Sequence, residues 1–587
     1  MKWPPTRATI LLLWALVVVF ALLRLFWLDA DPAGYILDDF ITDEGWYAHA
    51  ARNHALFGKW VMDEHNVALV LCPLHTLALR LSYAIFGVSF WSTRFVGAIA
   101  SVFTIVLVVW RLRKSPVSAA TAAALLATQP ILFALARVAY CESLQLLFVA
   151  AVWCFGSDPD RRSRSWFMAG AAAGLAVLAK ASAVYAPVLA LVAPFVTGGV
   201  DVRHRRTREM AWVLAGLGIV ILAFLPFELR FLDLLRIEQA REGSALWEGS
   251  GLPVGLFLPF VVGLHFRVGV LPGFWVGLFP LLAVFGVAAA RLVACVPSTQ
   301  HTRAPMRLAV VWGVVSLGLL CLRAAPAQPE RYWANLLVPV ACLVALACEP
   351  GLKPRPRIGR LGTWLAAAML AVGPALLIRQ GILTGLVLAL REPVHAIVRV
   401  RFMAPLMLLV GAALVLLLRR GRWPQRVSIG NGLPTVTMAV TIVGAAAVIT
   451  SLWAPKYTIR DASRALRAGF GSKVLTGDLA NTLALETPFR AFPCLDLATM
   501  DLRGGWVNGD WWVRGATHWI GDRPPGGKGW RPPPPPVAVL ESVYPIWPDA
   551  KGQPRITVYV SSLPSRATDR AGGEERSSGS NTERRMK

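Results

Sequence analysis

The sequence has few charged residues for its length. Only 16% of its 587 residues are Asp, Glu, Lys or Arg, and 56% are hydrophobic. Soluble proteins usually contain about 25% charged and about 45–50% apolar residues. The mean hydropathy is +0.55, and long apolar runs recur along most of the chain. This composition argues against an ordinary soluble protein and indicates a membrane protein with many spans.

Cysteine and acidic residues are also scarce. None of the eight cysteines forms a CxxC pair, and most lie inside apolar runs, so neither a zinc site nor a disulfide framework is indicated. The 34 acidic residues are outnumbered by 59 basic ones, which gives a net charge of +25. The basic residues form short clusters between apolar runs instead of one basic module. This distribution disfavours nucleic-acid binding and is typical of cytoplasmic loops between membrane spans.

The basic clusters predict how the chain crosses the membrane. They lie at 111–114, 161–164, 203–208, 291–307, 353–360 and 419–426. If all of them and the N-terminus are cytoplasmic, about thirteen helices are needed. We predict spans near 8–28, 94–110, 116–135, 143–156, 166–180, 184–199, 211–227, 272–290, 307–322, 334–349, 361–378, 402–418 and 434–453. The first span follows a short basic start and is too long for a typical cleaved signal peptide.

The region between the first two spans, residues 29–93, is then a long external loop. Its fairly apolar part, Leu69–Gly87, contains Pro73, His75 and Arg80, and we expect a helix lying in the membrane interface. The acidic residues gather outside: Asp38, Asp39, Asp43, Glu44, Asp63 and Glu64 in this loop, and Glu142 in the next external loop. Lys180, Arg230, Glu238, Arg323, Glu330 and Arg331 also fall at or near the outer side. Ionisable groups at that depth commonly mark a water-filled site.

The composition becomes polar after the last predicted span. Residues 454–565 contain strand-like runs (Lys473–Thr476, Val537–Leu540, Ile556–Val560) and two helical segments (Asp461–Ala468, Leu479–Leu485). We therefore expect three parts: a membrane domain over 1–453 whose 29–93 loop is catalytic, an external α/β domain over 454–565, and a disordered tail over 566–587.

Asp43 and Glu44 allow two interpretations. Thr42 could cap a helix whose dipole these acids complement. Alternatively they are chemical groups, because they lie in the first external loop beside Trp46 and Tyr47.

Several short motifs occur in the order found in one family. Asp43-Glu44, Tyr47-Ala48, Ala51-Arg52 and Gly58-Lys59-Trp60 are followed by CPLHTLALRLSYAIFG and by STRFVGAIASV, which has Arg94 at its head. Then come ARVAYCESLQLLF with Arg137 and Glu142, GLAVLAKASAVYAP with Lys180, and PERYWANLLVPV with Arg331 and Tyr332. Over roughly residues 8–350 this order resembles the GT-C glycosyltransferases of the family-39/83 type, the protein O-mannosyltransferases and lipid A aminoarabinose transferases. One departure is that Leu71-Cys72-Pro73-Leu74 stands where the lipid A subgroup has Lys-Pro-Pro-Leu, so an expected phosphate-contacting lysine is missing.

The resemblance implies a polytopic helical GT-C enzyme of the cytoplasmic (inner) membrane. Its active site faces outward and moves a sugar from a polyprenyl phosphate to an envelope acceptor by an inverting displacement. Asp43 would be the general base, with Glu44 as its support or as the base itself, and Glu142 would position donor or acceptor. Arg137, Lys180 and Arg331 would contact phosphate, with Tyr47 and His75 as weaker substrate-binding candidates. No cofactor and no metal are expected, although Asp43, Glu44 and Glu142 offer hard oxygen ligands. The expected partners are the lipid-linked sugar, the envelope acceptor and membrane lipids, and not nucleic acid. A secondary transporter and a lipid-linked glycan ligase or polymerase remain alternatives.

Overall fold

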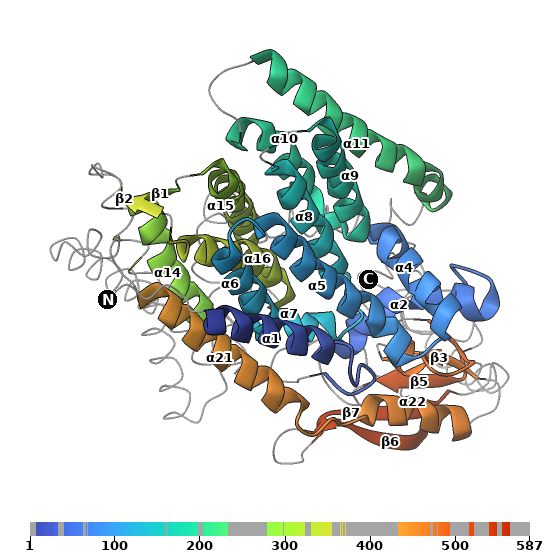
Figure 1. The fold of residues 1–587 in the computed structure, drawn as a ribbon. Coiled ribbons are helices and arrows are strands. Elements are labelled where there is room, and N and C mark those ends of the chain that lie inside the picture. Colours follow the sequence, from blue (N-terminus) through green and yellow to red (C-terminus); the bar gives the residue numbers. More distant parts are fainter. Residues whose placement is uncertain are drawn as a thin grey trace, which may run out of the picture.

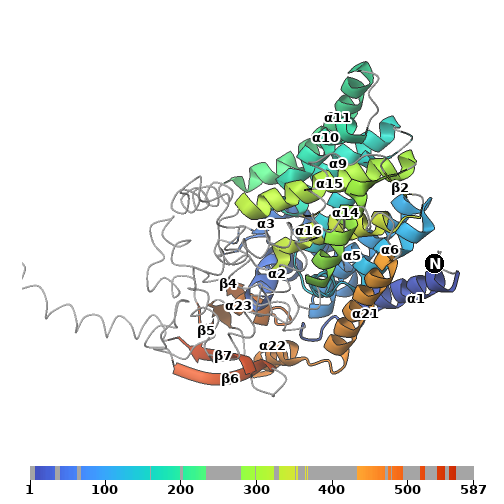
Figure 2. The ribbon, with the colours of Figure 1, turned by 90° about the vertical axis from the view of Figure 1, so that its left-hand side faces the viewer.

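The computed structural model describes residues 7–32, 40–62, 66, 68–158, 160, 162–197, 203–232, 279–297, 299–322, 330–350, 352–354, 364, 367, 370, 432–469, 473–477, 479–492, 516–521, 539–548 and 554–563. Helices form most of this structure, and a small sheet lies against one end of the helices (Figures 1 and 2).

Helices occupy most of the predicted spans. They are α1 (Arg7–Leu23), α5 (Phe90–Leu112), α6 (Pro116–Thr128) with α7 (Pro130–Ala136), α8 (Glu142–Gly156), α9 (Ser163–Ala179), α10 (Tyr185–Thr197), α11 (Arg203–Arg230), α14 (Phe279–Ala294), α15 (Gln300–Leu322), α16 (Glu330–Ala347) and α21 (Gly432–Leu452). The predicted spans 361–378 and 402–418 lie outside the described residues, apart from 364, 367 and 370. Among the described helices, α5, α11 and α21 are long and apolar enough to cross a membrane, and the bent pair α6–α7 makes a fourth candidate if counted as one span. The number thirteen therefore stays a prediction.

Helices α9 and α11 pack with their backbones in close approach (Figure 1). A Cβ atom on Gly170 of α9 would lie 1.9 Å from the carbonyl oxygen of Val213, and one on Gly216 of α11 would lie 2.0 Å from that of Phe167. Only glycine permits such an approach at these two positions. Small residues at a helix contact are typical of helices that associate within a membrane.

The predicted third span is broken into α6 and α7, which meet at an angle of 64°. Pro130 lacks a backbone N–H and starts α7, whose free N–H groups at Ile131 and Leu132 donate to the Gln129 side chain at 2.6 and 3.4 Å. The carbonyls left free at the end of α6 accept hydrogen bonds from the buried Arg24, at 2.8 Å for Ala127 and 2.9 Å for Leu126. The break is therefore stabilised from both sides.

The external loop contains α2 (Phe40–Phe57), α3 (Ala68–Leu71) and α4 (Pro73–Phe86). The helix predicted over Leu69–Gly87 is thus two helices divided at Cys72. Pro73 occupies the first position of α4, where a missing N–H costs no hydrogen bond. Gly87, with a φ of +75°, ends α4 in the left-handed region that favours glycine.

A mixed sheet forms in the polar C-terminal region. Its strands are β3 (Val474–Thr476), β4 (Arg490–Phe492), β5 (His518–Gly521), β6 (Val539–Pro548) and β7 (Pro554–Ser562), in the order β4-β3-β5-β7-β6. Strand β3 is parallel to both its neighbours, and the other pairs are antiparallel. Helices α22 (Thr458–Gly469) and α23 (Ala480–Leu483) lie in the two predicted helical segments.

The C-terminal region is not separate from the helices but packs on the external loop. Asp31 caps α22, because its Oδ1 accepts from the N–H of Ile459 at 3.1 Å and its Oδ2 accepts from Thr458 N–H at 3.0 Å. Asp29 pairs with Arg460. Buried residues of α22, β3, α23 and β7 belong to the same hydrophobic cluster as those of the helices. Segments more than 400 residues apart in sequence therefore share one core.

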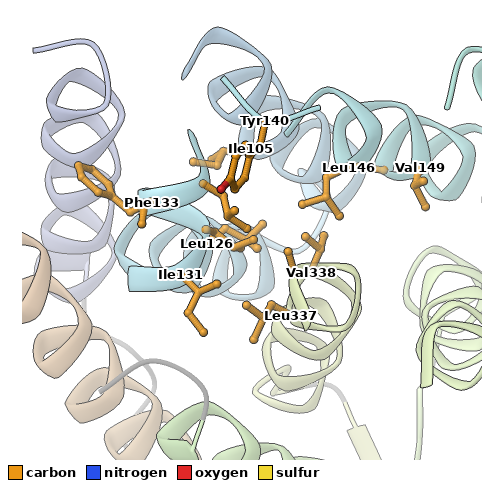
Figure 3. Close-up of a cluster of buried hydrophobic side chains, with 14 of the residues drawn as sticks. Ile105, Leu126, Ile131, Phe133, Tyr140, Leu146, Val149, Leu337 and Val338 are labelled. Carbon is orange, nitrogen blue, oxygen red and sulfur yellow. The ribbon is translucent and has the colours of Figure 1, made fainter. Parts of the chain in front are cut away.

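The centre of that core lies among α5, α6, α7, α8 and α16 (Figure 3). Figure 3 shows Tyr140, from the segment between α7 and α8, beside Ile105, with Leu126 and Leu337 nearby. The core thus fixes the segment that precedes Glu142.

Described residues of three basic clusters, 111–114, 291–307 and 353–360, come together at one end of the helices. Arg111 and Lys114, which link α5 to α6, line a cavity together with Pro297, Thr299 and Leu352. Gln300, at the start of α15, donates to the carbonyl of Thr197 at 2.9 Å, which brings the end of α10 to the same place. These clusters are the ones that the charge pattern assigns to one side of the membrane.

Candidate functional site

Asp43 and Glu44 lie in the first turns of α2 and have different surroundings. Glu44 is fully buried and Asp43 is half-buried. The carboxylate of Glu44 accepts two hydrogen bonds from Arg94, from Nε to Oε1 at 2.6 Å and from Nη2 to Oε2 at 2.7 Å. A two-point pair of this kind fixes the orientation of both side chains.

The same ion pair joins four segments of the chain. Oε1 of Glu44 also accepts from the N–H of Ala139 at 3.0 Å, and Nη1 of Arg94 donates to the carbonyls of Leu28 at 2.8 Å and Ala30 at 2.6 Å. Glu44 therefore holds α2, α5, the end of the first span and the segment before α8 together.

Glu142 and Lys180 form a second buried ion pair. Glu142 starts α8, Lys180 directly follows α9, and Nζ of Lys180 donates to Oε1 of Glu142; the two side chains are 1% and 10% exposed. The structure thus brings together an acid and a cation predicted separately for the site. The carboxylate keeps the buried lysine charged, and removing either partner would leave the other charge buried without it.

Aromatic rings connect α2 to this region. The ring of Tyr47 contacts the edges of His75 and Tyr140, with centroids 6.3 and 6.0 Å apart. Nε2 of His75 lies 3.3 Å from the carbonyl oxygen of Ala139, so this nitrogen carries the proton. Burial lowers the pKa of His75 to about 4, which makes the ring neutral near pH 7. His75 is therefore a polar neighbour of the site and not one of its cations.

Polar side chains extend from Glu142 towards the start of α16. Asn335 Oδ1 accepts from Gln145 Nε2 at 3.1 Å and from the hydroxyl of Tyr185 at 2.9 Å. Gln145 lies one turn after Glu142 on α8, and Asn335 lies one turn after Arg331 on α16. Arg331 is the second residue of α16, but its side chain is outside the described residues.

Arg137 differs from the other predicted phosphate contacts. Its Nη1 donates to the carbonyls of Leu23 at 3.0 Å and Phe26 at 2.5 Å, and its Nη2 donates to that of Trp27 at 2.7 Å. These bonds satisfy carbonyls at the end of α1, as Arg24 does for α6. They give Arg137 a structural role.

Segment 480–492 of the C-terminal region holds the other face of α2, a contact that the sequence analysis did not predict. The buried Arg52 donates to the carbonyls of Leu485 at 3.3 Å, Thr487 at 2.8 Å and Phe489 at 2.7 Å. The N–H of Gly45 donates to Oγ1 of Thr482 at 3.1 Å. A Cβ atom at Gly45 would lie 2.2 Å from the backbone nitrogen of Thr482, so the two segments are in direct contact. Arg52 stands in the Ala-Arg motif, which marked it as special without naming its partner.

The described residues contain no group of three or more His, Cys, Asp or Glu arranged to hold a metal ion. The expectation that no metal takes part is not tested by this observation.

Comparison with known proteins supports the GT-C resemblance. A sequence model of the family described as dolichyl-phosphate-mannose-protein mannosyltransferase matches residues 71–228. No curated protein matches the sequence. Among solved structures, ArnT from Cupriavidus metallidurans bound to undecaprenyl phosphate is 16% identical, with a TM-score of 0.53 over 95% of this chain and 99% of that one. The apo state of ArnT is 15% identical, with a TM-score of 0.50 over 86% and 92% of the two chains.

The matched region 71–228 runs from α4 to α11 and includes Glu142 and Lys180. At 15–16% identity, the two structural matches show a shared fold. Taken with the family match, they confirm the resemblance seen in the sequence: this chain has the fold of a GT-C membrane glycosyltransferase.

Proposed function

We propose that the chain transfers a sugar from a polyprenyl-phosphate donor to an acceptor of the cell envelope, on the outer face of the cytoplasmic membrane. The observation that carries the proposal is the buried pair of Glu142 and Lys180 at the ends of α8 and α9. The segment before Glu142 is tied through Ala139 to Glu44, the neighbour of Asp43 on α2. Acids from two loops and a cation are thereby held at one end of the helical structure.

The comparisons support the donor class. The matched family is described by its dolichyl-phosphate-mannose donor, and the structurally similar ArnT was solved with undecaprenyl phosphate. Both compounds carry a phosphate on a long polyprenyl chain. The apolar helices of this chain suit such a donor, because its lipid can remain in the membrane while its phosphate reaches the site.

In the proposed reaction, Asp43 accepts the proton from the acceptor hydroxyl or amine as that group attacks the anomeric carbon. The bond between this carbon and the phosphate oxygen breaks, and polyprenyl phosphate leaves with the bonding electrons. Lys180 and Arg331 stabilise the charge that grows on the phosphate. Attack from the face opposite the leaving group inverts the anomeric configuration.

The remaining predicted residues take supporting roles. Glu142 orients Lys180, Glu44 positions the start of α2, and Tyr47 with Tyr140 forms an aromatic wall beside them. Arg137 supports the end of α1. The proposed step uses no metal ion, so EDTA should leave transfer unchanged.

Membranes containing the chain test the proposal when given radiolabelled polyprenyl-phosphate sugar. Label should move to lipid or protein, and Asp43→Asn should reduce transfer by about 100-fold or more, since a general base contributes about 10²–10⁴-fold. Asp160→Asn, at a half-exposed acid in the link between α8 and α9, is the matched control and should retain full activity. Normal transfer by Asp43→Asn would remove Asp43 from the mechanism. Mass spectrometry of envelope lipids and glycoproteins from a deletion strain would then identify the acceptor.

A further inference from the structure

A cavity lies at the end of the helices where the basic clusters meet. It has a volume of about 150 Å³ and is lined by Arg111, Lys114, Ser115, His301, Thr302 and Glu349, among others. On this measure one water molecule needs roughly 15 Å³, so the cavity can hold a small polyatomic ion. It is too small for a nucleotide or for the acyl chains of a lipid.

The cavity presents more positive than negative charge. Its lining contains two permanent cations, Arg111 and Lys114, and one carboxylate, Glu349. Oε2 of Glu349 accepts hydrogen bonds from the hydroxyls of Ser115 and Ser118, at the start of α6. Glu349 is thus engaged at the N-terminus of α6.

Two hydrogen-bond donors at the cavity have no acceptor among the described residues. Arg111 donates to Ser157 through Nε at 2.8 Å and also through Nη2, and among the described residues its Nη1 makes no hydrogen bond. Nζ of Lys114 lies 3.2 Å from Nε2 of His301 and can only donate, so the ring proton of the neutral imidazole is on Nδ1. This buried Nδ1 has no hydrogen-bond partner within the part of the chain that the structure describes.

One further feature favours an anion here. His301 is the second residue of the 23-residue helix α15, whose dipole attracts negative charge to this end. The N–H groups of Thr302 and Arg303 donate to the carbonyl of Thr299. Burial is the largest cause that lowers the pKa of His301; the charges of Lys114 and Arg111 lower it further, whereas those of Asp160 and Asp158 raise it.

We propose that this cavity binds a phosphate anion, held by Arg111, Lys114 and His301 at the N-terminus of α15. Phosphate carries several acceptor oxygens, so one anion can accept hydrogen bonds from Arg111, Lys114 and His301 together. Its source is either the headgroup of an anionic phospholipid or free phosphate. The site is at the opposite end of the helices from Asp43 and Glu142, so it is independent of the transfer reaction.

One double variant and one control test the site in the purified full-length chain. The double variant Lys114→Gln/His301→Gln removes donors at the cavity without touching the bonds of Arg111 to Ser157. Arg113→Gln is the control, because Arg113 is exposed, contacts the ring of Trp110 and does not line the cavity. The probes are phosphatidylglycerol, compared with phosphatidylcholine in nanodiscs, and inorganic phosphate, compared with chloride at equal ionic strength.

Native mass spectrometry should show phosphatidylglycerol retained after delipidation, with at least tenfold less on the double variant than on the wild type and the control. This result identifies a lipid headgroup. If inorganic phosphate instead raises the His301 pKa measured by NMR and also raises the thermal midpoint, and the lipid has no effect, the ligand is free phosphate. Equal responses of wild type and double variant to both probes would overturn the proposal.

Discussion

Glu44 and Arg94, fifty residues apart in sequence, form a fully buried ion pair with two hydrogen bonds of 2.6 and 2.7 Å. The pair also binds the N–H of Ala139 and the carbonyls of Leu28 and Ala30. Removing either partner of this buried ion pair should lower the stability of the fold, because the other charge then stays buried without compensation.

Glu44→Gln should therefore act mainly on stability. Removing one partner of a buried pair costs about 3–5 kcal/mol, so the thermal midpoint and the yield of folded protein should fall. If Glu44 were instead the general base, transfer would collapse while the midpoint stayed unchanged. Thermal unfolding and transfer assays on the same preparation distinguish the two roles.

Asp160→Asn is the control for this prediction. Its ion pair with Arg162 spans 3.0 Å, but both side chains are at least half exposed. Exposed pairs contribute at most about 1 kcal/mol, so the midpoint should barely move. An equal loss in both variants would contradict the structural role of Glu44.

The pair of Glu142 and Lys180 should behave differently. Lys180→Met removes the cation beside the buried Glu142 carboxylate and should destabilise the chain, whereas the double variant Glu142→Gln/Lys180→Met removes both charges and should recover much of the lost stability. Transfer should remain lost in the double variant, because the cation that stabilises the phosphate is absent. Recovery of transfer together with stability would show that the pair is structural only.

Gly45→Ala should disturb the site through α2. The added Cβ would lie 2.2 Å from the backbone of Thr482, so α2 must shift away from the C-terminal region. A misplacement near 1 Å can cost about 100-fold in rate. We expect kcat to fall by about that factor with KM little changed. The control is Gly218→Ala on α11, where a Cβ meets nothing within 4 Å, and it should be near neutral.

Much of the helical fold was predictable from the sequence because apolar runs and basic clusters follow directly from membrane solvation. Predicted spans such as 143–156 and 434–453 differ from α8 and α21 by one or two residues. The division of the third span was missed, although Pro130 was visible, because proline also occurs within unbroken apolar helices such as α11, which contains Pro226.

The candidate site was predictable only in its parts. Motif order singled out Glu142 and Lys180, but only the folded chain shows that they pair. The contacts of Arg52 with Leu485, Thr487 and Phe489 cross more than 430 residues and use backbone carbonyls, which carry no sequence signal. For the same reason, the packing of the C-terminal region on α2 could not be predicted from the sequence.

Buried histidines of the external loop should make the chain sensitive to acid. Burial, with the nearby charge of Arg52, lowers the pKa of His49 to about 3, and burial lowers that of His75 to about 4. The ordinary pKa of histidine is near 6.5. Below pH 6.5, these two histidines therefore bind protons in the unfolded chain but stay neutral in the folded chain. The stability from each neutral ring is complete above pH 6.5 and is lost progressively as the pH falls to about 4 for His75 and about 3 for His49.

Each histidine should thus cost about 2 kcal/mol of stability between pH 7.5 and pH 5, since one pKa unit corresponds to about 1.4 kcal/mol. Between pH 7.5 and pH 5, the thermal midpoint of the double variant His49→Gln/His75→Gln should fall less than that of the wild type, because glutamine does not titrate. His54 is the control: its pKa is also lowered by burial, but its side chain lies nearer solvent, so His54→Gln should flatten the pH profile much less. If wild type and double variant lose the same midpoint between pH 7.5 and pH 5, these histidines are not responsible for the acid sensitivity, and carboxylates such as Asp31, which caps α22, become the groups to test.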